Sequence, residues 1–155
     1  MNSVSNRSRR QFLATSAVTL AAPAFLRAAA GQKLKAALIG HTGRGDYGHG
    51  LDIIFNDRPN VELVAVADAN PDGLAKMAAK LKAPRQYADY RVMLEKERPQ
   101  LVAIGPRHAD QHRAMGLAAV AVGAHIYMEK PITPTLAEAD ELLAAADQRG
   151  LKVAV

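Results

Sequence analysis

The chain has 155 residues, of which 49% are apolar, and it carries 20 Lys and Arg against 15 Asp and Glu. It contains no cysteine, which excludes disulfides, thiolate metal ligands and a cysteine nucleophile. Four of the basic residues and none of the acidic ones lie in residues 1–30, so the rest of the chain holds 16 basic against 15 acidic side chains. Such a balance is typical of an ordinary solvated surface, and we expect no nucleic-acid partner.

Residues 1–30 have the pattern of an export signal. A basic segment precedes an apolar run from Phe12 to Phe25, which is shorter than the roughly 20 residues that a membrane-spanning helix needs. Ser8-Arg9-Arg10-Gln11-Phe12-Leu13-Ala14 matches the twin-arginine pattern except at the last position, where Lys is usual. We therefore expect cleavage after Ala30, export by the twin-arginine machinery, and a periplasmic or extracellular location. An amphipathic N-terminal helix or a Sec signal is the alternative.

The remaining residues, 31–155, alternate between two kinds of pattern. Short apolar runs predict six strands, at 34–39, 61–67, 85–87, 101–104, 125–128 and 151–155. Helical patterns lie between them, at 46–56, 71–81, 89–97, 110–122 and 135–149, with N-caps expected at Asp89 and Asp110 and a capping box from Thr135 to Glu138. This alternation predicts one α/β domain, a doubly wound parallel sheet of the Rossmann fold with order 3-2-1-4-5-6 and helices on both faces.

A glycine-rich loop, Gly40-His41-Thr42-Gly43-Arg44-Gly45, follows the first predicted strand. The dinucleotide fingerprint G-x-G-x-x-G needs glycine for a tight turn, for close backbone approach to the pyrophosphate, and for helix packing. Gly40 and Gly45 fill the first and third places, while Thr42 stands at the second and Gly43 follows it. We expect Gly40, Thr42, Gly43, Arg44 and Gly45 to bind the cofactor; a flexible surface loop is the alternative.

Asp68 ends the second predicted strand, 23 residues after Gly45. A carboxylate at this place accepts hydrogen bonds from the adenosine ribose and repels a 2′-phosphate. Asp68 therefore favours NAD over NADP, although Arg44 could soften that preference. The alternatives are a solvated aspartate at a strand end, or a cap for the helix that starts near Pro71.

The fourth and fifth predicted strands end in Gly105-Pro106 and in Glu129-Lys130-Pro131, and here the chain resembles the Gfo/Idh/MocA oxidoreductases over residues 34–155. The resemblance implies that Lys130 lies beside nicotinamide and substrate, where it polarises the substrate or relays a proton. It implies that Glu129 contacts the nicotinamide ribose. Pro106 and His112 resemble cofactor-binding residues that follow the family's fourth strand, although Gly105 stands where Thr is usual.

A metal site on His108, Asp110 and His112 is an alternative for this segment, but Asp110 is better used as a helix cap, so we expect no metal. The resemblance implies hydride transfer between NAD and a small carbohydrate-like substrate: a sugar, cyclitol or polyol. It also implies a further substrate-binding domain that mediates homo-oligomer contacts; because the sequence ends at Val155, we expect the cofactor half, with little turnover of its own. An NAD-dependent glycoside hydrolase and a non-catalytic dinucleotide-binding module are the alternatives.

Overall fold

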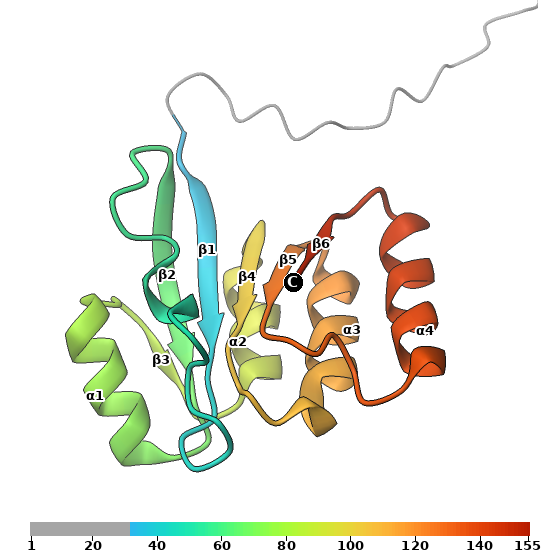
Figure 1. Cartoon of the computed structure of the whole chain (residues 1–155). Coiled ribbons are helices and arrows are strands. Elements are labelled where there is room, and N and C mark those ends of the chain that lie inside the picture. Colours follow the sequence, from blue (N-terminus) through green and yellow to red (C-terminus); the bar gives the residue numbers. More distant parts are fainter. Residues whose placement is uncertain (1–31) are drawn as a thin grey trace, which may run out of the picture. The chain divides into compact units, whose positions relative to one another are not determined.

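The computed structural model describes residues 32–155, so the predicted export signal lies outside the described residues. One parallel sheet forms the centre of the domain, and its strand order, β3-β2-β1-β4-β5-β6, confirms the predicted doubly wound fold (Figure 1). The strands are β1 (Leu34–Ile39), β2 (Val61–Ala67), β3 (Gln86–Tyr87), β4 (Leu101–Ile104), β5 (His125–Met128) and β6 (Val153–Ala154).

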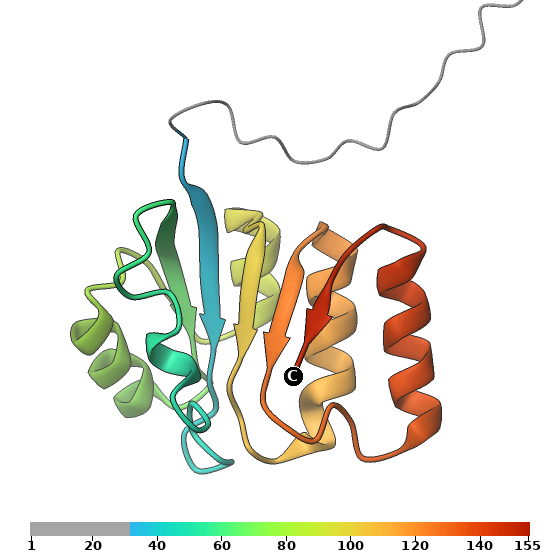
Figure 2. The same ribbon diagram turned by 45° about the horizontal axis from the view of Figure 1, so that its top comes forward.

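Helices cover both faces of the sheet, as Figure 2 shows. Because successive side chains of a strand point to opposite faces, β1 divides its residues between two apolar layers. Leu38 packs in the layer beneath α1 and the segment around η2, whereas Ile39 packs in the larger layer beneath the other three helices. The helical elements are α1 (Pro71–Leu81), α2 (Tyr90–Glu97), α3 (His112–Val122), α4 (Leu136–Asp147) and two 3-10 turns, η2 (Leu51–Ile53) and η3 (Ala109–Gln111).

Side-chain caps start three of the four α-helices, α1, α2 and α4. The Asp89 carboxylate accepts from the Arg91 N–H at 2.8 Å, which confirms the predicted cap of α2. Thr135 Oγ1 accepts from the Glu138 N–H at 3.3 Å, but Glu138 Oε2 is buried without a partner, so only the hydroxyl half of the predicted capping box forms. Asp110 does not cap α3: it lies inside η3, Gln111 occupies the N-cap position, and the Asp110 carboxylate pairs with Arg44 instead.

The helix predicted over 46–56 is wrong. This segment consists of turns, with only the three residues of η2 in a 3-10 conformation. Asp46, Gly48 and Gly50 have positive φ angles of 55°, 71° and 93°, which a right-handed helix cannot contain. The connection from β1 to β2 is therefore long and irregular, and the segment around η2 packs against the apolar layer that contains Leu38.

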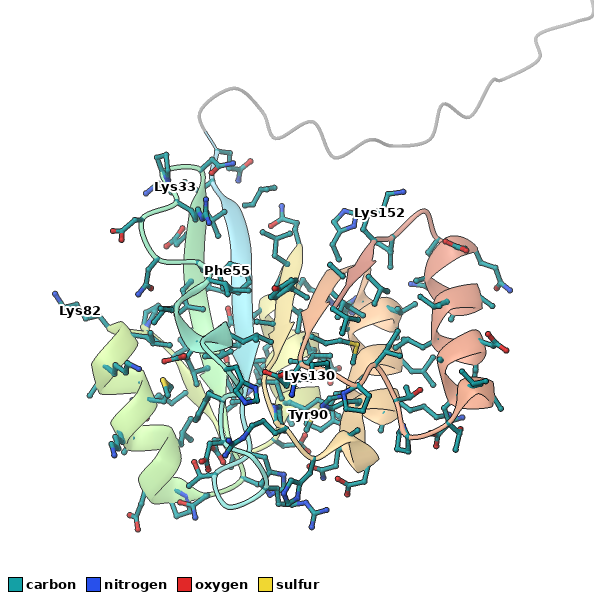
Figure 3. All side chains as sticks on the ribbon, in the orientation of Figure 1. Lys33, Phe55, Lys82, Tyr90, Lys130 and Lys152 are labelled. Carbon is teal, nitrogen blue, oxygen red and sulfur yellow. The ribbon has the colours of Figure 1, made fainter. Side chains whose placement is uncertain are left out.

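All six strands are parallel, so their carboxyl ends lie along a single edge of the sheet. In Figure 3, Lys130, which follows β5, lies toward this lower edge, whereas Lys33 and Lys152, which precede β1 and β6, lie toward the upper edge. The predicted site residues follow β1, β2, β4 and β5 and so gather at the carboxyl edge. Within residues 32–155, no helix combines the length and the apolarity that crossing a membrane requires.

Candidate functional site

The glycine loop turns sharply after β1 and packs against the loop after β4. The Gly40 N–H donates to the Ala67 carbonyl of β2 at 2.8 Å, which fixes where the loop leaves the sheet. Gly45 has a φ of +89°, and a Cβ built on it would lie 2.3 Å from the Arg107 backbone nitrogen. The third glycine of the fingerprint is therefore required by close packing against the backbone of the loop after β4, whereas the motif predicts packing against a helix.

Thr42, at the second fingerprint position, is accommodated between β2 and α1. Its hydroxyl donates to Asp68 Oδ2 at 2.7 Å. A Cβ on Gly73, in the first turn of α1, would lie 1.9 Å from Thr42 Oγ1, so the absence of a side chain at Gly73 makes room for the threonine. The glycine that the fingerprint lacks at position 42 is thus matched by Gly73 on the neighbouring helix. Sequence reasoning missed the role of Gly73, because Thr42 and Gly73 are far apart in the chain.

The Asp68 carboxylate is 2% exposed and is already hydrogen-bonded. Besides the Thr42 hydroxyl, it accepts from the backbone N–H groups of Thr42, at 3.0 Å, and Asn70, at 2.9 Å. Since a carboxylate has about four lone-pair sites, a ribose hydroxyl can join or replace one of these donors. The structure places Asp68 where the sequence predicts it, at the end of β2; its contact with ribose stays a prediction.

A pocket of about 270 Å³ lies beside Asp68, at the carboxyl ends of β1 and β2. Its lining includes His41 from the glycine loop, Asp89 and Tyr90 from the start of α2, and Met115 from α3. The volume suits one half of a dinucleotide. Sequence reasoning missed Tyr90, whose ring lies 4.5 Å from the Arg91 guanidinium carbon, because a single aromatic residue in a helix carries no motif.

Two carboxylates of the chain accept hydrogen bonds from backbone N–H groups of the glycine loop. Asp46 Oδ1 accepts from the Gly43 N–H at 2.9 Å, and Asp68 accepts from the Thr42 N–H. Successive loop amides of this kind form a concavity that attracts anions. A Cβ on Gly43 would meet no other atom within 4 Å, so a ligand can reach the backbone there. The loop and the adjoining pocket therefore fit the pyrophosphate and one nucleoside of a dinucleotide.

The buried ring of Tyr47 packs against Gly40, the first residue of the glycine loop. Its side chain is 6% exposed, and its ring would lie 2.1 Å from a Cβ on Gly40. Burial raises the pKa of the phenol, and the nearby negative charge of Asp68 raises it further, so Tyr47 stays neutral at physiological pH. Tyr47 thus acts through packing beneath the first glycine of the motif.

Polar contacts join the loops after β1 and β4. Arg44 Nη2 pairs with Asp110 Oδ2 at 2.5 Å, and His41 Nδ1 lies 2.5 Å from Gln111 Oε1. The Arg107 N–H donates to the Gly45 carbonyl at 3.3 Å. β1 and β4 flank the point at which the strand order reverses, where doubly wound folds bind their ligands.

The loop after β5 brings Glu129 and Lys130 to the same edge. Glu129 is 3% exposed and accepts from the His49 N–H at 2.8 Å and from the Lys130 N–H at 3.2 Å. Burial opposes ionisation of Glu129, but the hydrogen bonds from His49 and Lys130 outweigh it, and the pKa of the carboxyl is lowered. Lys130 is exposed. An ionised carboxylate and an exposed ammonium group therefore lie on adjacent residues.

His112 joins the loops after β4 and β5 from within the core. Its ring is 0% exposed, with Nε2 2.6 Å from the Pro106 carbonyl oxygen and Nδ1 2.8 Å from the Pro131 carbonyl oxygen. The geometry therefore shows His112 and Pro106 fixing the shape of the crevice, and direct contact of either with the cofactor stays a prediction. Among residues 32–155, no group of three or more acidic or histidine side chains is arranged to hold a metal ion.

A doubly wound parallel sheet, with a glycine loop after its first strand and a carboxylate at the end of its second, defines a dinucleotide-binding Rossmann domain. Residues 34–155 match the profile of the oxidoreductase family with an NAD-binding Rossmann fold, Gfo/Idh/MocA. The chain belongs to this family, which confirms the resemblance seen in the sequence, and NAD is its cofactor.

Individual proteins agree with this assignment. Trans-1,2-dihydrobenzene-1,2-diol dehydrogenase from Sus scrofa is 32% identical over 94 residues, which cover 61% of this chain and 28% of that protein. D-apiose dehydrogenase from Paraburkholderia graminis is 30% identical over 101 residues, which cover 65% of this chain and 27% of that protein. The crystal structure of an NAD-binding oxidoreductase from Klebsiella pneumoniae is similar, with a TM-score of 0.64 and 31% identity. The similarity covers 79% of this chain and 34% of that protein. The matched part of the chain thus spans about a third or less of the length of each of these proteins.

Proposed function

We propose that this chain is the NAD-binding part of an exported oxidoreductase that transfers hydride between nicotinamide and a carbon bearing a hydroxyl group in a sugar, cyclitol or polyol. The observation that carries the proposal is the pair at the end of β5, where exposed Lys130 adjoins the buried, ionised Glu129. Two relatives are named for a diol and for a sugar, apiose, which supports a substrate with neighbouring hydroxyl groups.

Each half of the crevice has residues suited to one half of the cofactor. The pocket beside Asp68 and Tyr90 would hold the adenosine, and the backbone of the glycine loop would hold the pyrophosphate. The nicotinamide half would then extend toward the ends of β4 and β5, where Glu129 lies. When bound, NAD supplies the hydride acceptor of the reaction.

Lys130 would be the residue that touches the substrate. An ammonium group beside a reacting hydroxyl stabilises the alkoxide that develops as the carbon loses hydride, and it can pass the hydroxyl proton on. Its exposure leaves the ammonium group accessible to a substrate at the carboxyl edge of the sheet. Glu129 would accept a hydrogen bond from the nicotinamide ribose and so set the distance between nicotinamide and Lys130.

Export by the twin-arginine route is also part of the proposal. It is supported by Arg9-Arg10 directly before an apolar run, and by the absence of acidic residues from residues 1–30. This route carries folded proteins, which fits a cofactor that is loaded in the cytoplasm. Replacing Arg9 and Arg10 by Lys should leave the protein in the cytoplasm, as fractionation would show; unchanged export would contradict the route.

The activity is tested with the protein as its gene encodes it, incubated with NAD and a panel of sugars, cyclitols and polyols. We expect NADH fluorescence to appear with at least one of them, and Lys130→Met to lower the rate by about 100-fold or more while NAD still binds. Release of the aglycone from aryl glycosides without net NADH would instead support a hydrolase. Binding of NAD with neither reaction would support a non-catalytic module.

A further inference from the structure

Glu129 is held by a residue that the glycine fingerprint does not include. His49, in the loop after β1, is 80 residues away in the chain, yet it makes two contacts with this carboxylate. Its backbone N–H donates to Oε2 at 2.8 Å, and its ring Nδ1 lies 3.1 Å from Oε1. A Cβ on Gly48 would lie 2.5 Å from Glu129 Oε2, so the backbone just before His49 is pressed against the carboxylate.

These contacts fix both partners. Because an ionised carboxylate only accepts hydrogen bonds, a proton on Nδ1 of His49 would let the ring donate to Oε1. Each oxygen of Glu129 lies against His49, Oε2 at the backbone N–H and Oε1 at the ring nitrogen. The imidazole of His49 itself is 56% exposed, so this contact is not needed to bury an apolar surface.

The position of the pair in the fold indicates which part of a ligand it meets. The fold consists of two halves that meet at the strand reversal between β1 and β4. The pocket beside Asp68 lies in the first half, and Glu129 ends β5 in the second. Among the described residues, 32–155, one donor reaches Glu129 Oε2, the His49 N–H, which leaves a lone pair for a further donor. The hydroxyl groups of a ribose are neutral donors of the required kind.

We propose that His49 is a positioning residue for the nicotinamide ribose: it orients Glu129 so that one carboxylate oxygen faces the ribose hydroxyls. This inference rests on the proposed function to the extent that it requires a dinucleotide in the crevice. It also accounts for the irregular loop after β1, because a helix over these residues would not carry the His49 backbone to the end of β5. The competing interpretation is a structural tie between two loops.

Fragments of the cofactor separate the two interpretations. Dissociation constants for NAD, ADP-ribose and ADP are measured on the full 155-residue chain and on its His49→Ala, Glu129→Gln and double variants. We expect His49→Ala to raise the dissociation constants of NAD and ADP-ribose by about tenfold. The dissociation constant of ADP should change by less than about twofold, because ADP lacks the second ribose. The double variant should be no weaker than Glu129→Gln, because His49 acts through Glu129.

The control is His125→Ala, which removes a histidine with one hydrogen bond at the opposite edge of the sheet and should change none of the three constants. Equal weakening of ADP, ADP-ribose and NAD by His49→Ala would show a structural tie and overturn the inference. Unchanged NAD binding in His49→Ala would overturn it as well. A wild-type chain that binds none of the three ligands would overturn the proposed function together with the inference.

A spectroscopic measurement keeps the inference testable if the Glu129 variants do not fold. Nitrogen-15 NMR of the wild-type histidines should show a proton on Nδ1 of His49, assigned by the loss of that signal in His49→Ala. The chemical shift of His49 Nδ1 should change when ADP-ribose is added and stay unchanged when ADP is added. A His49 ring that is protonated only on Nε2, or one that responds equally to both ligands, would contradict the proposal.

Discussion

The hydroxyl of Thr42 donates a 2.7 Å hydrogen bond to Asp68, so the residue that departs from the dinucleotide fingerprint is bonded to the carboxylate expected to bind ribose. This hydrogen bond therefore joins the glycine loop to the carboxyl end of β2. The coupling requires Gly73 on α1, because any side chain there would collide with Thr42. Residues that look independent in the sequence form a single unit in the fold.

Replacing Thr42 by Val tests this unit. The change keeps the shape of the side chain and removes one donor from a buried carboxylate, so the free energy of unfolding should fall by about 1 to 2 kcal/mol. Urea unfolding of the purified chain measures it. Thr135→Val, at the exposed start of α4, serves for comparison: it removes an N-cap in which Thr135 Oγ1 accepts from the Glu138 N–H, and it should lower the free energy of unfolding by about 1 kcal/mol. An unchanged unfolding free energy for Thr42→Val would contradict the assigned hydrogen bond.

Asp68 should govern the choice between NAD and NADP. Asp68→Asn keeps the size of the side chain and one of its two acceptor oxygens, and it removes the negative charge that repels a 2′-phosphate, so the ratio of NADP to NAD affinity should rise by about tenfold. Titration with both dinucleotides measures the ratio. Glu62→Gln, at the exposed amino end of β2, removes the same charge far from the pocket and should leave the ratio unchanged. Tighter binding of NADP than NAD by the wild-type chain would refute the preference.

Acid should destabilise the domain partly through Glu97. Burial opposes ionisation of this carboxyl, but hydrogen bonds from Tyr87, at 2.5 Å, and Arg85, at 2.6 Å, outweigh it and lower its pKa below the ordinary 4.5. The stabilisation is fully present above pH 4.5 and is lost as the pH falls through the lowered pKa of the folded state. Urea unfolding at several pH values should show a shallower acid decline for Glu97→Gln; an identical decline would assign the effect to other groups.

Freeing Arg44 should strengthen cofactor binding. Its partner Asp110 is 52% exposed, so Asp110→Asn should change the free energy of unfolding by less than about 1 kcal/mol. The unpaired guanidinium at the glycine loop should nevertheless attract the pyrophosphate and tighten NAD binding about threefold at low salt, an effect that salt should screen. Glu141→Gln breaks the comparable Arg113 pair between α3 and α4 and is the control. Weaker NAD binding in Asp110→Asn would contradict this role of Arg44.

The sheet order and most element positions could be predicted because they depend on patterns that are local in the sequence. Buried runs such as 61–67 carry their own signal, and so does a cap such as Asp89. The predicted helix at 46–56 failed because apolar spacing there was counted without the backbone cost of Gly48 and Gly50. The two glycines, which adopt positive φ angles at low cost, were the signal in the sequence that could have corrected it.

The candidate site was predictable where a motif carries it and not where a distant contact does. Gly40, Asp68 and Glu129 follow strands at recognisable spacings, so the sequence places them at the correct edge. Asp110 was assigned to a cap because its partner, Arg44, is 66 residues away. Contacts of this kind depend on the tertiary fold, and the same is true of His49 and Gly73.

Asp46 and Asp68 already hold amides of the glycine loop, which changes what cofactor binding means for this chain. A pyrophosphate that bound the Gly43 and Thr42 N–H groups would have to replace these carboxylates, one anion for another. The affinity for NAD would then depend on how much more strongly these N–H groups bind pyrophosphate than they bind the carboxylates of Asp46 and Asp68. The two carboxylates pair backbone donors of the glycine loop, and these hydrogen bonds stabilise its shape from within the chain.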